Sequence, residues 1–187
     1  MISSYDRSGY FGASDTDKIL GKRTSNTWNK WWLQKLGISS ERFDNVYTLA
    51  GTHFEHRILE SLGIPMELDR QIIIEDLRLR VNLDGNTDDC IYECKTYKAD
   101  KPFKMPKKYI NQVNVQMYAS GLRRAKIVTY ALVEKDYLNF FGEIDPVRRT
   151  VYDVPYDGHF INDIYLPQLR FLADCLKRGL LPKEVCK

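Results

Sequence analysis

The chain has 187 residues, of which 43% are hydrophobic and 28% charged, and its formal net charge is +3. This is the composition of a soluble globular protein long enough to bury a substantial core, and we expect one domain over residues 1–187. No apolar run approaches the ~20 residues of a membrane span and no signal peptide is recognisable, which argues against a membrane partner and favours the cytoplasm. The weak positive charge neither requires nor excludes a nucleic-acid partner.

Three helices are expected in the first third of the chain. The first covers residues 14–20 with Ser14 as its N-cap, the second covers residues 26–36, and the third covers residues 49–62. Glycines are expected to end the second and third, at Gly37 and Gly63. The second helix carries three tryptophans, Trp28, Trp31 and Trp32. We expect them in the core rather than as stacking platforms for bases, because tryptophan is usually buried.

The remainder of the chain is expected to supply a sheet and two more helices. The predicted strands cover residues 71–75, 77–84, 90–97, 126–135, 139–145 and, at an edge, 150–154. One helix starts near Tyr109 and ends near Gly121, and the last helix is capped by Asp157, kinked by Pro167 and ended by Gly179. This order predicts an α/β fold with a mixed central β-sheet flanked by helices.

The segment from Asp84 to Lys95 carries the clearest chemical signal. Asp84 ends an apolar strand, a polar turn follows, and the next strand contains Glu93-Cys94-Lys95. Residues two apart in a strand share a face, so Glu93 and Lys95 point the same way, and antiparallel pairing brings Asp84 beside them. The two carboxylates and the backbone carbonyl of Cys94 are ligands that Mg²⁺ prefers. With Lys95 near a water on that metal, the segment suits phosphodiester hydrolysis, although a charged surface hairpin is the competing interpretation.

Two helices flank this segment with further polar candidates. Glu55 lies close to the apolar stripe of its helix and is a candidate metal or water ligand. Gln112 and Gln116 are one turn apart, and they are candidates for touching phosphate or orienting active-site side chains. An exposed glutamate and a solvated glutamine pair are the alternatives for these residues.

Lysines crowd the stretch between the Glu93 strand and the Gln112 helix: Lys98, Lys101, Lys104, Lys107 and Lys108. We expect an irregular loop beside the active site that offsets repulsion between carboxylates and a DNA backbone, or otherwise a solvated loop. The four cysteines lack paired ligand spacing and are expected to be reduced thiols; they are Cys90, Cys94, Cys175 and Cys186. The histidines show no convincing metal pattern.

Taken together, these segments resemble the restriction-endonuclease-like PD-(D/E)XK nuclease superfamily, and within it the lambda-exonuclease and YqaJ-type viral recombinase family. The matching motifs are Gly12-Ala13-Ser14-Asp15, with Arg7 seven residues before Ser14; Gly51 to Glu55; Leu83-Asp84-Gly85; Glu93-Cys94-Lys95; and Gln112. The resemblance covers residues 7–180. Departures are Asn114 in place of a second glutamine, Asn82 where a serine often contacts phosphate, and a chain shorter than is usual for the family.

The resemblance implies a metal-dependent DNA exonuclease with Mg²⁺ as cofactor, or Mn²⁺ in its place. Asp84, Glu93 and the Cys94 carbonyl would hold the metal, with Glu55 directly or through water. Lys95 would orient or deprotonate the attacking water, and Gln112 would complete the catalytic group. The remaining candidates would bind DNA or a 5′ phosphate: Arg7, Ser14, Asn82, Gln116, Lys104, Lys107 and Lys108.

It further implies 5′ to 3′ digestion of linear duplex DNA for phage-type recombination and DNA repair, in a phage- or prophage-encoded protein. A single-strand annealing protein is the implied partner, and a ring-shaped homo-oligomer is the implied assembly. Two other functions stay open. One is a restriction-like or structure-specific endonuclease with the same metal residues, and the other is a non-catalytic nucleic-acid-binding protein on a nuclease scaffold.

Overall fold

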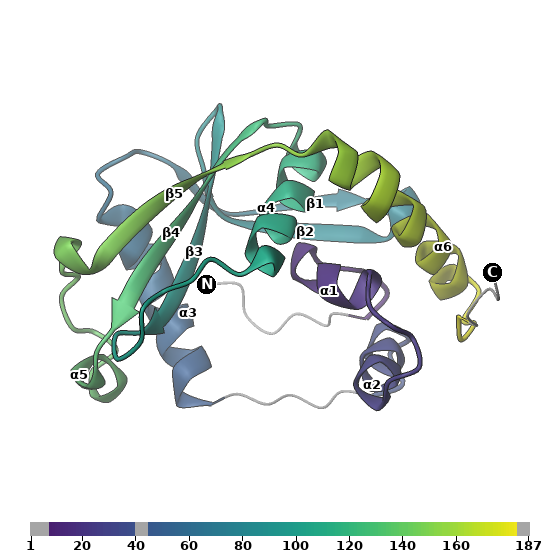
Figure 1. The fold of residues 1–187 in the computed structure, drawn as a ribbon, viewed down its shortest axis with the longest axis horizontal. Helices are drawn as coiled ribbons and strands as arrows, with labels where there is room; N and C mark the ends of the chain where they lie inside the picture. Colours follow the sequence, from purple (N-terminus) through teal and green to yellow (C-terminus); the bar gives the residue numbers. More distant parts are fainter. Residues whose placement is uncertain (1–7, 40–44, 183–187) are drawn as a thin grey trace.

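The fold is a five-stranded sheet with helices on both faces (Figure 1), seen in a computed structural model that describes residues 8–39 and 45–182. The strands are β1 (Glu67–Ile74), β2 (Leu79–Asn86), β3 (Cys90–Lys98), β4 (Arg124–Leu132) and β5 (Arg149–Pro155). The α-helices are α1 (Thr16–Ile19), α2 (Asn26–Lys35), α3 (Val46–Glu60), α4 (Lys107–Ser120), α5 (Glu134–Leu138) and α6 (Leu166–Lys177). The expected α/β class with a mixed central sheet is confirmed.

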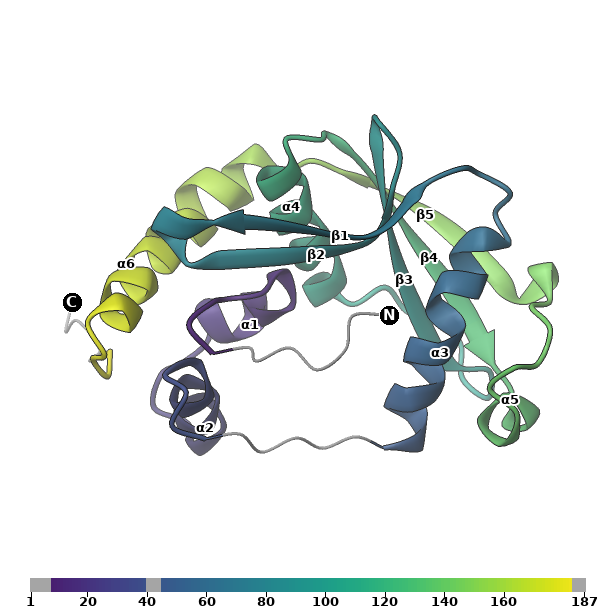
Figure 2. The same cartoon turned by 180° about the vertical axis from the view of Figure 1, so that it is seen from behind.

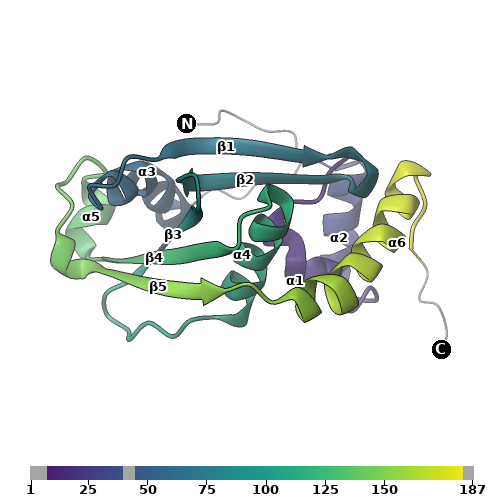
Figure 3. The same cartoon turned by 90° about the horizontal axis from the view of Figure 1, so that it is seen from above.

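The sheet has the order β1-β2-β3-β4-β5, with β3 and β4 parallel and the other neighbours antiparallel. The β2–β3 pairing is short, with Gly85 opposite Tyr92 and Asn86 opposite Ile91. Beyond this contact the two strands diverge, so that the β1–β2 hairpin runs at a steep angle to β3, β4 and β5 (Figures 1 and 2). The view from above shows the hairpin on one side of β3 and the strands β4 and β5 on the other (Figure 3). The strongly twisted sheet therefore has an internal corner, and Asp84 and Glu93 lie next to it.

Each face of the sheet is covered by its own hydrophobic cluster. On one face, α3 packs on β3 and β4 through Ala50, Phe54, Ile58 and Leu59 against Cys90, Tyr92, Cys94, Val128 and Tyr130. The other cluster joins β2, α2, α4 and α6, and it contains the three predicted core tryptophans, of which Trp32 is fully buried. Figure 2 shows α3 alone against the near side of β3, apart from the helices of the second cluster.

The α3 helix approaches the sheet closely at two glycines. A Cβ atom on Gly51 would lie 3.0 Å from Thr96 Oγ1, and one on Gly85 would lie 2.6 Å from Met66 Sδ and 3.2 Å from Leu59 Cδ1. The two motifs that contain these glycines thus bring the Glu55 helix onto the strands that carry Asp84 and Glu93. Close packing is the physical reason for glycine at both positions.

The expected strand over residues 139–145 is wrong. Residues 134–138 form α5, and the segment that follows forms no backbone hydrogen-bond ladder with a described strand. Arg57 donates to the carbonyl oxygens of Phe140 and Gly142, which are acceptors that a strand would need for pairing. The neighbour of β4 is instead β5, which confirms the expected edge strand near residues 150–154.

Several helix boundaries also differ from expectation, and α3 starts at Val46 and not at residue 49. Ser14 lies inside a 3₁₀ turn, Ala13–Asp15, and it is the Asp15 carboxylate that accepts from Gly12 N at 2.7 Å. The α4 helix starts at Lys107, so Lys107 and Lys108 belong to its first turn and not to the preceding loop. Pro167 lies in the first turn of α6, where its missing N–H is tolerated, after a π-helical turn over Phe160–Tyr165.

Other expectations at the ends of elements are confirmed. Asp157 Oδ1 accepts from Phe160 N at 2.8 Å, and Gly37, Gly63 and Gly179 all have positive φ, as expected for residues that end helices. In the described part of the chain Cys90, Cys94 and Cys175 are buried free thiols. Among residues 8–39 and 45–182, no helix is long and apolar enough to cross a bilayer.

Candidate active site

The candidate site lies at the corner where β2 and β3 begin to diverge. Gly85 pairs with Tyr92 at the end of the β2–β3 ladder, so the next residue of each strand, Asp84 and Glu93, lies at the point where the strands separate. Asp84 Oδ2 accepts a hydrogen bond from Cys94 N at 2.8 Å. Because this N–H belongs to the middle residue of Glu93-Cys94-Lys95, the bond fixes the aspartate directly against the motif.

Glu93 is the most enclosed carboxylate of the site, with 1% of its surface exposed. Its Oε1 accepts from Lys95 Nζ at 2.6 Å and from Gln112 Nε2, and its Oε2 accepts from Gln116 Nε2. Both glutamines come from α4, one turn apart on the face that meets the sheet. Three donors on one carboxylate compensate for its burial and hold it in one orientation.

Gln116 was expected either to touch phosphate or to orient active-site side chains. Its side chain is fully buried and also donates to Asn82 O at 3.3 Å, which argues against contact with phosphate and favours the second role, positioning of Glu93. Its Oε1 atom has no hydrogen-bond partner among the described residues. Gln112 is half-buried and donates to the other oxygen of the same carboxylate.

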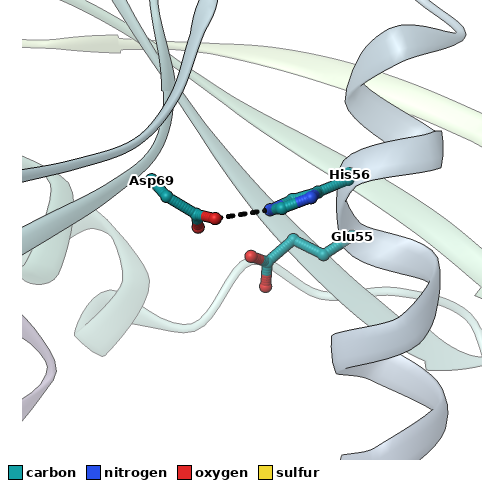
Figure 4. A group of neighbouring side chains, drawn as sticks. All are labelled: Glu55, His56 and Asp69. Atoms are coloured by element: carbon teal, nitrogen blue, oxygen red, sulfur yellow. Dashed lines mark ion pairs between the residues drawn. The ribbon is translucent and has the colours of Figure 1, made fainter. Parts of the chain in front are cut away.

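Glu55 reaches the site from α3, on the other face of β3. Figure 4 shows its carboxylate directed toward the same space as His56 and Asp69. His56 Nε2 lies 3.1 Å from Asp69 Oδ2, and the ligand atoms of these three side chains lie within 4.8 Å of one another. Asp69 has φ +58 and stands opposite Asp84 in the β1–β2 register, between Leu68–Gly85 and Arg70–Leu83.

His56 and Asp69 were not among the residues predicted from the sequence. Asp69 precedes the strand expected over residues 71–75, whereas β1 begins at Glu67. Extension of that strand by four residues would have placed Asp69 across from Asp84. His56 follows Glu55 directly, and its proximity to β1 depends on how α3 is docked, which no local pattern encodes.

The carboxylates of the site repel one another. Burial raises the pKa of Asp84 well above its ordinary value, and the nearby Glu93 and Glu55 carboxylates raise it further. Burial and then Glu93 raise the pKa of Glu55 to about 7. Burial alone would lower the pKa of Lys95, but Glu93 and Asp84 outweigh it, so this pKa lies above its ordinary value. Lys95 is therefore held as an ammonium group, 5.1 Å from the centre of the Tyr109 ring.

Five of the candidate residues for DNA binding are exposed on the described part of the chain. Asn82 is exposed on β2, and its Oδ1 accepts from Gln71 Nε2 at 3.1 Å. Ser14 and Lys104 are exposed, as are Lys107 and Lys108 on the first turn of α4. Arg7 lies outside the described residues.

Comparison with known proteins places the chain in a family. Its sequence matches the model of the YqaJ-like viral recombinase domain over residues 5–123, which is more than half of the chain. The protein belongs to this family. The resemblance inferred from the motifs is thereby confirmed, and the matched region contains the first glycine motif, Glu55, Asp84, Glu93 and Gln116. No curated protein sequence matches the chain.

Solved structures with a similar fold extend this result. An alkaline exonuclease (LHK-Exo) from Laribacter hongkongensis is 19% identical, with 92% of this chain and 94% of that chain covered and a TM-score of 0.61. Its complex with dAMP gives 20% identity, the same coverage and a TM-score of 0.64. A phage-related exonuclease from Haemophilus somnus 129PT is 15% identical, with 91% and 96% covered and a TM-score of 0.66. At these identities the comparison shows a shared fold over nearly the whole chain.

Proposed function

We propose that this YqaJ-family protein is a divalent-metal-dependent DNA exonuclease that hydrolyses phosphodiester bonds at the β2–β3 corner. The observation that carries the proposal is the arrangement of Asp84, Glu93 and Lys95 around one point, with Glu55 approaching from α3. A protein that only binds nucleic acid has no need of three mutually repelling carboxylates beside a lysine. The fold shared with exonuclease structures supports the same reaction class.

The residues of the site fit a hard divalent cation. Burial and mutual repulsion raise the pKa values of Asp84 and Glu55, which indicates too little positive charge for the carboxylates present. We propose Asp84, Glu93 and the Cys94 carbonyl as ligands, with Glu55 as a direct or water-mediated ligand; Mg²⁺ suits these oxygen donors, and Mn²⁺ is expected to replace it. The bound cation would supply Lewis-acid polarisation of the phosphoryl group and a lowered pKa for water.

The side chains of the protein have separable tasks in the proposed reaction. Gln112 and Gln116 hold Glu93, and the Cys94 N–H holds Asp84, so that both carboxylates keep their orientation. Lys95 is an ammonium group and acts as a donor: it orients the attacking water and balances charge that develops on the phosphate.

Strand direction, end preference and assembly are finer proposals. Digestion from 5′ to 3′, a terminal phosphate held by Ser14, Asn82 and Arg7, and a contribution of Lys104, Lys107 and Lys108 to DNA binding follow from the motif resemblance. A ring-shaped homo-oligomer, a single-strand annealing partner and a phage-encoded protein acting in the cytoplasm of a bacterial host have the same basis. All of them remain predictions.

The decisive experiment is digestion of end-labelled linear duplex DNA with Mg²⁺, with and without a 5′ phosphate, beside a closed circular duplex. An exonuclease shortens the linear duplex from its ends and leaves the circle intact. Cleavage of the circle would favour the endonuclease alternative. Binding of DNA without cleavage of any substrate would overturn the proposal in favour of a non-catalytic protein.

A further inference from the structure

The first turn of α4 places an aromatic ring beside the lysine of the proposed active site. Tyr109, Gln112 and Gln116 are three and four residues apart, so they share the face of α4 that meets the sheet. The two glutamines donate to Glu93, and Lys95 Nζ lies over the Tyr109 ring, 5.1 Å from its centre. One face of this helix therefore contacts both charged residues of the motif on β3.

A single hydrogen bond does not fix the Lys95 ammonium group. The Lys95 side chain is 21% exposed, and its Nζ donates to Glu93 Oε1 at 2.6 Å. An ammonium group has three N–H donors and is carried on a flexible four-carbon stem. Glu93 Oε1 also accepts from Gln112, and Glu93 is a proposed metal ligand. A further contact is needed to decide where the remaining donors of Lys95 point.

The Tyr109 ring supplies that contact. The negative face of an aromatic ring attracts an ammonium group, most strongly where water is partly excluded. The ring is itself held in place, because Tyr109 is half-buried and packs against the cluster that joins β2, α2, α4 and α6. Its backbone N–H donates to Pro106 O at 3.0 Å, which fixes the first turn of the helix. The core of the protein thus sets the position of the ring, and the ring restricts the lysine.

A second lysine lies near the same ring, at the edge of the site. Lys108 Nζ is 5.4 Å from the centre of the Tyr109 ring, and Lys108 is exposed on the first turn of α4. Lys95, in contrast, belongs to β3 and contacts Glu93. The contact of the ring with Lys95 is therefore the one inside the proposed site, and an experiment can separate it from the contact with Lys108.

We infer that Tyr109 is a positioning residue for Lys95, and that its ring holds the ammonium group so that Lys95 donates both to Glu93 and to the attacking water. The inference rests on the proposed nuclease function and adds a residue to it. Tyr109 contacts no reacting atom in this arrangement and acts through Lys95. Loss of the ring should therefore lower the rate of cleavage and leave the affinities for DNA and for the metal nearly unchanged.

The first test compares Tyr109→Phe, which keeps the ring, with Tyr109→Leu, which keeps only apolar packing. In single-turnover assays, Tyr109→Leu should cleave DNA about five- to thirty-fold more slowly than the wild type, the range expected for a partly desolvated cation–π contact. Tyr109→Phe should recover most of this loss, and the half-saturating DNA concentration should change little in either variant. A Tyr109→Phe protein as slow as Tyr109→Leu would overturn the inference, because the ring would then not be the active part.

Tyr156→Leu is the matched control for these variants. Tyr156 is also half-buried, packs against the same cluster and has the guanidinium carbon of Arg123 over its ring, 4.2 Å from the centre. Its contact lies outside the proposed site, so Tyr156→Leu should cleave DNA like the wild type. A loss of rate equal to that of Tyr109→Leu would show a general effect of removing a ring and would overturn the inference.

The effect of the ring must pass through Lys95 and not through Lys108. In a Lys95→Ala background, Tyr109→Leu should cause no further loss of rate, whereas in a Lys108→Ala background it should cause its full loss. Additive losses for Tyr109→Leu and Lys95→Ala would overturn the inference. Disappearance of the Tyr109→Leu effect in the Lys108→Ala background would overturn it as well, since the ring would then act through the exposed lysine.

A spectroscopic measurement in EDTA tests the contact apart from catalysis. The ring current of Tyr109 should shift the NMR signals of the Lys95 ε-methylene protons upfield, and Lys95→Arg assigns these signals by their absence. The shift should persist in Tyr109→Phe and disappear in Tyr109→Leu. If the wild type cleaves DNA but the signals are the same in all three proteins, the inference is overturned and the proposed function stands. If the wild type cleaves no DNA, the proposed function fails and the inference fails with it.

Discussion

Glu93 and the Asp84–Glu55 pair have opposite environments within one site. Glu93 receives donors from Lys95, Gln112 and Gln116 and is almost completely buried. Asp84 receives the Cys94 N–H, and the pKa values of Asp84 and Glu55 are raised by burial and by neighbouring carboxylates. The fold alone thus stabilises one carboxylate, whereas the other two need additional positive charge.

This difference separates structural from chemical roles in a way that mutations can test. Removal of Glu93 leaves three donors without their acceptor, so both stability and activity should suffer. Removal of the Asp84 charge relieves repulsion, so activity should suffer while the metal-free protein becomes no less stable. If all three carboxylates were exposed, removing Glu93 would not lower the stability, and removing the Asp84 charge would not relieve repulsion.

The largest effect is expected for the two metal ligands. Asp84→Asn and Glu93→Gln should each abolish cleavage, because the site has few hard ligands and each of these two is central to it. In EDTA, the melting temperature of Asp84→Asn should equal or exceed that of the wild type, whereas Glu93→Gln should melt lower. Nuclease assays and thermal melts on the same preparations measure both quantities.

The matched control for this pair is Asp88→Asn, which removes an exposed carboxylate from the turn between β2 and β3. It should leave both activity and melting temperature unchanged. Near-normal cleavage by Asp84→Asn or Glu93→Gln would contradict the assignment of the metal site.

Lys95→Ala should come next in size. Loss of a positioned donor to the reacting groups is typically worth about 10²–10⁴ in rate. Metal affinity should change much less than the rate, because the ammonium group of Lys95 contacts Glu93 and does not itself ligate a cation. Single-turnover rates and metal titrations of the same variant separate the two effects, and a loss of metal affinity alone would argue against this role.

Substitutions of the two α4 glutamines should have smaller effects, and they should also separate loss of activity from loss of stability. Gln112→Ala removes a half-buried donor and should lower the rate about ten-fold with little change in stability. Gln116→Ala removes a fully buried donor and leaves a cavity, so it should also cost about 1–3 kcal/mol of unfolding free energy. Equal melting temperatures for the two variants would show that the buried Gln116 side chain contributes no more to the stability of the fold than Gln112.

Much of this site follows from the sequence because it depends on local geometry. Strand alternation places Glu93 and Lys95 on one face, and the short turn brings Asp84 against the Glu93-Cys94-Lys95 segment. The 3.6-residue repeat places Gln112 and Gln116 on one face of α4. What strand alternation leaves undetermined is the docking of α3, which decides that Glu55 meets His56 and Asp69.

The errors have the same origin in long-range contacts. The false strand over residues 139–145 has suitable composition, but Arg57 of α3 donates to two of its carbonyl oxygens, those of Phe140 and Gly142. Ser14 looks like an N-cap, yet Asp15 accepts from Gly12 N, and Asp15 is itself held by Trp31 Nε1 and Lys35 Nζ of α2. In the first case a side chain distant in sequence takes acceptors that a strand ladder would need, and in the second the capping residue is the one that distant side chains of α2 hold in place.

The last prediction concerns the pH dependence of the protein's stability, which we expect Glu55 to control in part. Its pKa is raised from an ordinary 4.5 to about 7, so the folded protein prefers the neutral acid. This preference stabilises the fold fully below about pH 4.5 and is lost as the pH rises through about 7. The corresponding loss of unfolding free energy is on the order of 3 kcal/mol. In EDTA, the melting temperature should therefore fall between pH 5 and pH 8, and Glu55→Gln should reduce that fall.

Added Mg²⁺ should act in the opposite direction. A cation favours the ionised carboxylates, so it should raise the melting temperature more at pH 8 than at pH 5. Glu60→Gln, at an exposed position on the same helix, serves as the control and should follow the wild type at both pH values. If Mg²⁺ stabilises the protein equally at pH 5 and pH 8, or if Glu55→Gln retains the full wild-type difference, then Glu55 does not belong to the group of carboxylates that binds the cation, and α3 contributes only packing to the site.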